Sequence, residues 1–136
     1  TMTYTLPRYV ALTGSCLAAT IKDMNTTFFK NWTNQIRKGL LELAILNDIR
    51  NRRMYGYEII RKFRKDHGVL ISEGTVYHIL KRFKEQGLVK NTEAKSPDGP
   101  KKKYYHLTET GRQTLAQMNG HWLAMAKQTN AIKKGK

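Results

Sequence analysis

The chain has 136 residues, a common size for one compact domain, and its 25 Lys and Arg against 10 Asp and Glu give a formal net charge of +15 at pH 7. This charge exceeds what solubility requires and indicates a polyanionic partner, with nucleic acid as the first candidate. A hydrophobic fraction of 40% supports a packed core and excludes a disordered basic tail. The single cysteine, Cys16, excludes internal disulfides and multi-cysteine zinc sites, so we expect a reducing cytoplasmic location.

Residues 1–23 mix Thr, Pro and Gly without a clear period, and we expect them to form an N-terminal extension outside the core fold. The most apolar stretch, Tyr9 to Ala19, is too short to cross a membrane. The apolar run before Cys16 is also short for a secretion signal, and Thr13 fits a lipobox poorly. The sequence therefore predicts neither a membrane partner nor export.

From residue 24 onward the sequence is strongly patterned, and residues 24–108 are predicted to form the main domain. Between Asn25 and Arg50, apolar residues recur at steps of three or four, which predicts an amphipathic helix that Gly39 interrupts. The basic segment Arg50–Arg53 fits either a phosphate clamp or a basic helix C-terminus. A second, shorter helix follows Gly56 and ends near Gly68.

A third helix is predicted to begin after Ser72, a residue suited to an N-cap, and to stop at Gly87. Two strands, Leu88–Lys95 and Lys101–Thr108, flank a type I turn at Ser96–Pro100. The last segment, 109–136, is predicted to hold a long helix from Glu109 to Ile132 followed by a basic tail. Its apolar residues repeat at steps of three and four, which favours an interhelix seam: Leu115, Met118, Trp122, Met125 and Ile132.

Three helices followed by a hairpin are the order of a winged helix-turn-helix, a mainly α fold with a small β-hairpin, in which the third helix enters the DNA major groove. With Val76, Ile79, Leu80 and Phe83 facing inward, helical geometry turns Thr75, His78 and Arg82 outward, where they can reach base edges. Side chains suited to phosphates lie beside them or at the hairpin tip: Ser72, Tyr77, Lys81, Lys84, Lys101, Lys102 and Lys103. The alternative is a merely solvated helix face and a solubilising loop.

Several stretches together resemble the PadR family of bacterial transcriptional regulators, from about Ile36 to Met125. The similar motifs are Lys38–Leu46 in the first helix, Met54–Ile59 with its Gly-Tyr-Glu-Ile run, Ser72–Tyr77, and Lys103–Gly111 at the end of the hairpin. The single C-terminal helix is similar to that of the small subgroup, which includes a cyanobacterial clock regulator. His78 departs from the family pattern, which has Pro at this place.

The resemblance implies a nucleoid-associated repressor that binds double-stranded DNA as a homodimer, with one third helix and one wing on each half of a palindromic operator. The seam of the last helix, together with Phe28 and Trp32, is the expected dimer contact. In some small members an aromatic residue at the place of Trp122 lines a pore for flat ligands, so a small-molecule effector is a further option.

Three other functions are less favoured by the residues. A protein-binding adaptor would use the aromatic surface of Phe28, Trp32 and Trp122, and an RNA-binding protein would use the same basic face. An enzyme is disfavoured because no nucleophile lies in a motif with a base, and the four histidines lack metal-ligand spacing. We therefore expect no catalytic residue, no metal ion and no cofactor.

Overall fold

The computed structural model describes residues 17–67 and 71–135 of the chain. These residues fall into two units, one ending at Leu40 and the other beginning at Leu41. Most of the predicted N-terminal extension, residues 1–16, lies outside the described part of the chain. Its last residues, from Leu17 onward, belong to a helix.

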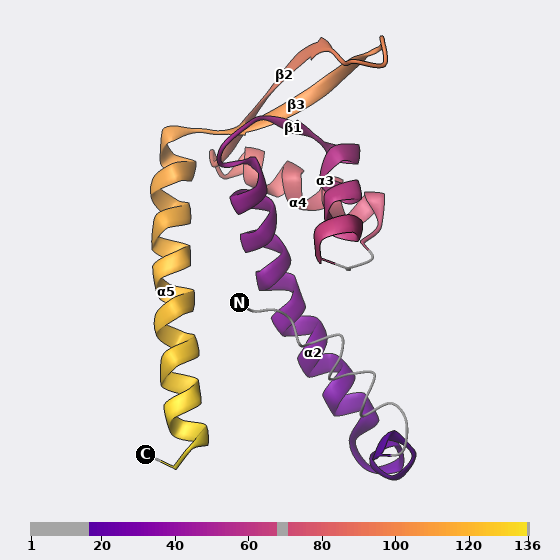
Figure 1. The fold of residues 1–136 in the computed structure, drawn as a ribbon, viewed down its shortest axis with the longest axis vertical. Helices are drawn as coiled ribbons and strands as arrows, with labels where there is room; N and C mark the ends of the chain where they lie inside the picture. The colour runs from indigo at the N-terminus through magenta and orange to yellow at the C-terminus, as the bar shows by residue number, and fades with distance from the viewer. Residues whose placement is uncertain (1–16, 68–70, 136) are drawn as a thin grey trace. The chain divides into compact units, whose positions relative to one another are not determined.

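The elements follow in the order helix α2 (Leu17–Ile49), strand β1 (Met54–Tyr55), helix α3 (Gly56–Lys62), a π-helical turn η1 (Phe63–His67), helix α4 (Glu73–Glu85), strands β2 (Val89–Lys95) and β3 (Lys101–Leu107), and helix α5 (Glu109–Lys133) (Figure 1). The predicted fold class is confirmed: the chain is mainly α-helical with a small antiparallel sheet.

The N-terminal unit, as far as it is described, is the part of α2 up to Leu40. The helix runs through Gly39 without the predicted interruption. One glycine in a helix costs only about 1 kcal/mol relative to alanine, which neighbouring turns offset easily. Phe28, Phe29, Trp32 and Ile36 are exposed on this part, and the Phe29 and Trp32 rings stack with centroids 6.2 Å apart.

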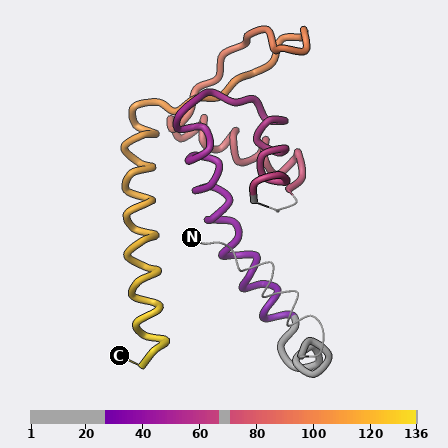
Figure 2. The backbone as a smooth tube through the Cα atoms, viewed as in Figure 1, coloured from indigo at the N-terminus to yellow at the C-terminus, as the bar shows by residue number. Residues whose placement is uncertain are grey.

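The second unit contains a three-stranded sheet in the order β1-β3-β2. Strand β1 was not predicted, because two residues are too short to show an alternating pattern. It exists through pairing with β3, in which Met54 lies opposite Tyr105 and Tyr55 opposite Tyr104. Val89, Tyr105 and Leu107 of the sheet pack in the core of this unit, and the β2–β3 hairpin protrudes from it (Figure 2).

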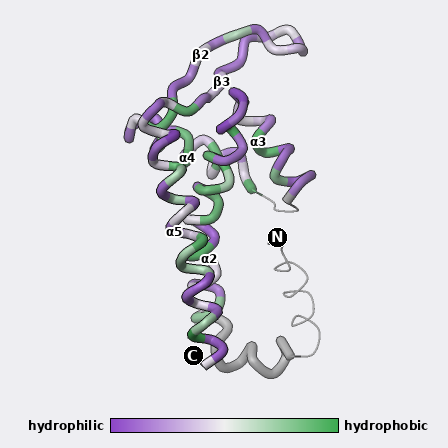
Figure 3. The backbone as a smooth tube through the Cα atoms, turned by 60° about the vertical axis from the view of Figure 1, so that its left-hand side comes forward, coloured by the Kyte–Doolittle hydropathy of each residue, from purple (hydrophilic) through white to green (hydrophobic). Residues whose placement is uncertain are grey.

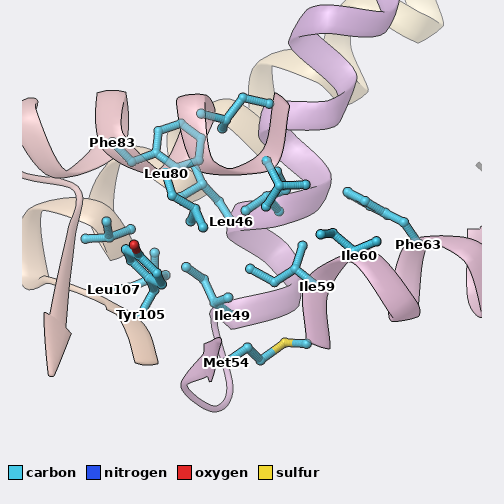
Figure 4. Packing of buried hydrophobic residues seen from close by; sticks show 14 of the residues in the cluster. Leu46, Ile49, Met54, Ile59, Ile60, Phe63, Leu80, Phe83, Tyr105 and Leu107 are labelled. Atoms are coloured by element: carbon cyan, nitrogen blue, oxygen red, sulfur yellow. The ribbon is translucent and has the colours of Figure 1, made fainter. Parts of the chain in front are cut away.

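The core of this unit joins the last turns of α2, helices α3 and α4, and the covered face of the sheet (Figure 4). Its fully buried side chains include Ile45, Leu46, Ile59, Phe63 and Leu80. They recur at helical spacing in each segment, so each helix turns one apolar face inward. This packing fixes how α4 presents its opposite face to solvent.

Helix α5 begins at a tight corner directly after β3. Thr108 caps the helix: its hydroxyl accepts from the Gly111 amide at 2.9 Å and donates to the Gly87 carbonyl at 2.6 Å. A Cβ on Gly111 would lie 2.0 Å from the Leu88 carbonyl oxygen, so only glycine fits against that backbone. Farther along, the Asn47 and Asn119 side-chain amides bond reciprocally at 3.1 and 3.0 Å and tie α5 to the end of α2.

Candidate nucleic-acid interface

Helix α4 separates an apolar face from a polar one. Val76, Ile79, Leu80 and Phe83 are buried, as predicted. Thr75, His78 and Lys81 are exposed, and Lys81 forms a solvent-exposed ion pair with Glu85 at 3.7 Å. Three polar side chains of different chemistry therefore stand on one exposed helix face, which is the arrangement that base-edge contacts require.

The start of α4 is held by Ser72, whose hydroxyl accepts from the Thr75 amide at 3.1 Å. The Ser72 and Thr75 hydroxyls also lie 2.9 Å apart and share a hydrogen bond. Both residues remain exposed. The first turn of α4 is thus pre-ordered, and capping is the role that the structure gives Ser72.

Tyr77 packs against the N-terminal end of α3. A Cβ on Gly56 would lie 2.5 Å from the Tyr77 ring, so the glycine of the Gly-Tyr-Glu-Ile run makes room for this side chain. Burial, followed by the nearby Glu73 and Tyr105, raises the pKa of the Tyr77 hydroxyl above its ordinary value of 10.0. The hydroxyl therefore stays protonated at neutral pH and is able to donate a hydrogen bond to an acceptor such as a phosphate oxygen.

Arg82 differs from the prediction of a free outward side chain. Its guanidinium forms an ion pair with the carboxylate of Glu42 on α2. The Glu42 side chain is only 16% exposed, so withdrawing Arg82 toward a base would leave a largely buried carboxylate unpaired. Arg82 therefore ties α4 to α2 and is poorly placed to read a base edge.

The β2–β3 hairpin is the wing. Its turn is closed by a hydrogen bond from the Gly99 amide to the Ser96 carbonyl at 3.0 Å, and Gly99 adopts a φ of 109° that favours glycine. Residues opposite each other in the register share one face of the hairpin. Lys95 lies opposite Lys101, and Glu93 lies opposite Lys103.

Placing two lysines directly opposite each other is unfavourable in an isolated hairpin. Lys95 was missed in the sequence because it precedes the turn, although strand pairing back from Pro97–Pro100 would have placed it beside Lys101. The exposed side chains of Lys95, Lys101 and Lys103 thus concentrate positive charge on one face of the wing.

Lys102 does not belong with these three lysines. It lies on the other face of β3, where its ammonium sits 5.3 Å from the centroid of the Tyr55 ring. On the same face the Arg53 guanidinium lies 4.6 Å from the Tyr104 centroid, and the two tyrosines meet edge to face at 5.4 Å. Lys102 is half-buried in this cation–aromatic cluster, whereas Lys95, Lys101 and Lys103 are exposed. A phosphate contact by Lys102 stays a prediction.

Figure 3 shows the hydropathy of the residues along helix α5, and the five residues predicted for its seam differ in exposure. Leu115 is 1% exposed and packs in the core of its own chain, with Met118 partly buried against that core. Leu115 is therefore not free for a partner, because the Thr108–Gly111 corner presses the first turns of α5 onto the sheet. Trp122, Met125 and Ile132 are exposed, and so is Leu123, which lies outside the predicted spacing.

In the two described segments, 17–67 and 71–135, no helix has a continuous apolar run of the length needed to cross a membrane. Within the same residues, no three His, Cys, Asp or Glu side chains gather as metal ligands would.

Comparison with known proteins places this arrangement in a family. Residues 45–117 match the model of the transcriptional regulator PadR-like family. A PadR-like transcriptional regulator of Bacillus cereus is 35% identical, with a TM-score of 0.68 over 75% of this chain and 99% of that one. Bacillus subtilis PadR, solved in complex with operator DNA, is 28% identical, with a TM-score of 0.52 over 61% of this chain and 46% of that one.

A curated relative, an uncharacterized protein of Lysinibacillus sphaericus, is 30% identical over 91 residues, which make up 65% of this chain and 84% of the relative. The motifs that suggested the resemblance fall mostly inside the matched range, and they include the Gly56 and Gly111 positions at which a Cβ would collide. The family is one of transcriptional regulators. This chain belongs to the PadR-like family of transcriptional regulators.

Proposed function

We propose that this regulator is a sequence-specific DNA-binding repressor that acts as a homodimer on a palindromic operator. In this proposal α4 enters the major groove and the wing contacts phosphates. The observation that carries the proposal is the two-sided character of α4. Thr75 and His78 are exposed on one face of the helix, and the apolar residues of the opposite face are buried. The operator complex of Bacillus subtilis PadR supports DNA as the ligand.

The division of work between α4 and the wing follows from their side chains. Thr and His on α4 are short and carry both donors and acceptors, which suits discrimination between base edges. The ammonium groups of Lys95, Lys101 and Lys103 are compact charges on flexible stems, which suits phosphates of any sequence. Tyr77, exposed on α4 and packed against Gly56, adds a neutral donor.

The homodimer is supported by the apolar residues that the single chain leaves uncovered. Trp122, Leu123, Met125 and Ile132 are between 38% and 73% exposed on α5. Burying each large side chain of this kind contributes about 1.5 to 3 kcal/mol. A second copy supplies the same apolar surface by symmetry, so each exposed stripe covers the other. Phe28 and Trp32 offer further apolar surface on the N-terminal unit.

Repression, a palindromic site and a location at the nucleoid are inferred from the family resemblance. A small-molecule effector near Trp122 and the similarity to a clock regulator stay predictions.

The test is a titration of duplex DNA at ~150 mM salt, using a site selected from a random duplex pool and a scrambled duplex of equal length. We expect the selected site to be palindromic and preferred by about a thousandfold or more. A preference below about tenfold would contradict sequence-specific binding. Competition by single-stranded RNA at equal concentration would instead indicate an RNA ligand.

A further inference from the structure

A second basic surface consists of residues that belong neither to the exposed face of α4 nor to the wing lysines. Five cationic side chains line an open hollow of about 620 Å³ on α3, η1 and the segment before β1: Arg52, Arg61, Lys62, Arg64 and Lys65. We call this set the α3–η1 surface. Its residues take no part in the contacts proposed for α4, the wing or α5.

The charges of this surface are only partly compensated. Lys62 pairs with Asp66 at 3.2 Å and lies 3.9 Å from Asp48, and Arg52 pairs with Glu58 at 3.3 Å. Within the described part of the chain, Arg64 and Lys65 form no ion pair, and both are exposed. The Arg61 guanidinium lies over the Tyr57 ring, 5.3 Å from its centroid. Among the residues that the structure describes, the carboxylates paired with this surface therefore leave part of its positive charge uncompensated.

The backbone beneath these side chains is a π-helical turn, which is rare and occurs often at functional sites. Phe63 anchors the turn in the core at 1% exposure. Arg64 and Lys65 follow directly and point into solvent. The turn thus holds the side chains of Arg64 and Lys65 at the hollow, while the buried Phe63 fixes the backbone beside them.

The chemistry of the lining selects among possible ligands. A pocket for a small molecule is closed and mainly apolar, whereas this hollow is open and seven of its eight lining residues are charged, five of them basic and two, Glu58 and Asp66, acidic. The centre of a protein–protein interface is depleted in charged residues, which disfavours a protein partner. An extended polyanion fits both observations, because long cationic side chains follow a row of phosphates without needing an enclosed site.

The surface is also continuous with the base of the wing. Arg52 lines the hollow, and the next residue, Arg53, lies over Tyr104 of β3. Lys102 sits over Tyr55, the ring that packs edge to face against Tyr104. A row of cations thereby leads from the wing to α3 and η1.

We propose that the α3–η1 surface binds the sugar-phosphate backbone of DNA that flanks the stretch contacted by α4 and the wing. The inference rests on the proposed function, since it adds flanking contacts to a bound operator. It makes the bound DNA longer than the palindrome itself.

The test compares Arg64→Ala/Lys65→Ala with the unmodified protein on two duplexes that contain the selected site. One duplex is about 20 bp long, enough for two half-sites one helical turn apart, and the other adds about 10 bp at each end. Each phosphate contact contributes about 0.9 to the slope of log affinity against log salt. The variant homodimer loses two contacts at each end, four in all, so the affinity change between 50 and 200 mM salt should shrink by roughly a hundredfold on the long duplex only.

The matched control is Lys133→Ala/Lys134→Ala, which removes the same charge from the exposed end of α5. Arg64→Gln/Lys65→Gln keeps more of the side-chain stems and repeats the test if the alanine variant unfolds. Equal behaviour of the Arg64/Lys65 variant and the control on the long duplex would overturn the inference, and so would an equal loss on both duplexes. Failure of the unmodified protein to prefer the selected site on the short duplex would instead contradict the proposed function.

Discussion

Helices α4 and α5 are both amphipathic, yet they leave opposite faces uncovered. On α4 the apolar residues are buried in the same chain and the exposed residues are polar. On the second half of α5 the exposed residues include Trp122, Leu123, Met125 and Ile132. An uncovered polar face suits DNA, whose contacts are mostly hydrogen bonds and charges, and an uncovered apolar face suits a second protein copy. In the proposed function, α4 therefore recognises DNA and α5 joins the two copies.

We expect the largest effect from substitutions in the exposed apolar residues of α5, which should weaken the dimer. Trp122→Glu/Met125→Glu places charges on the exposed stripe and forfeits about 1.5 to 3 kcal/mol of burial for each large side chain. We expect the dimer dissociation constant to rise by more than a hundredfold. Sedimentation velocity would show monomers, and the preference for a palindromic duplex would fall with it.

The control for this prediction is Gln117→Glu/Gln128→Glu, which adds the same charge at exposed polar positions of α5. It should leave the dimer intact. A Trp122/Met125 variant that remains dimeric at micromolar concentration would show that another surface joins the copies.

We expect the next largest effect, a loss of DNA affinity, from removing the exposed lysines of the wing. Lys95→Ala/Lys101→Ala/Lys103→Ala removes three exposed cations from one face of the hairpin. Affinity for the selected and scrambled duplexes should fall by a similar factor. The salt slope should drop by up to about 5.4, because the two wings of the homodimer lose six phosphate contacts and each contributes about 0.9.

The single variants Lys102→Ala and Lys101→Ala compare two neighbouring lysines of strand β3 that lie on opposite faces of the hairpin. Since Lys102 packs over Tyr55, its loss should change the salt slope less than loss of Lys101 alone. It should lower the free energy of unfolding by about 0.5 to 1 kcal/mol. Equal slopes for the two single variants would show that Lys102 leaves Tyr55 to reach phosphate.

The smallest effect concerns the Glu42–Arg82 ion pair. Arg82→Ala and Glu42→Gln should each destabilise the fold, and their double-mutant cycle should give a coupling of about 1 kcal/mol, because Arg82 is partly exposed to solvent. The order of preferred DNA sequences should remain unchanged in Arg82→Ala. A relaxed preference at one position of each half-site, without coupling to Glu42, would restore Arg82 to base recognition.

Local patterns predicted the elements better than they predicted the partners of individual side chains. Helix α4 follows from its apolar period and the Ser72 cap, and the wing follows from its turn residues, because these signals lie within a few residues of each other. The match to the family covers the same elements.

Contacts between distant parts of the chain were missed. Arg82 meets Glu42 only once α2 and α4 are packed, and Leu115 enters the core only because Gly111 allows the start of α5 to approach Leu88. Leu115 and Trp122 occupy equivalent positions in the repeat of three and four residues along α5, so periodicity alone does not separate a core residue from an exposed one. Strand β1 likewise depends on its pairing with β3.

The central claim is that α4 reads sequence while the wing binds phosphates, and selection of duplexes from a random pool by three proteins tests it most directly. The unmodified protein and Lys95→Ala/Lys101→Ala/Lys103→Ala should select the same palindrome, the latter only at lower salt. His78→Ala should select a palindrome with relaxed preference at one base pair in each half-site, equivalent to about 1 to 3 kcal/mol of lost discrimination. An unchanged selection by His78→Ala together with an altered one by the lysine variant would contradict the account.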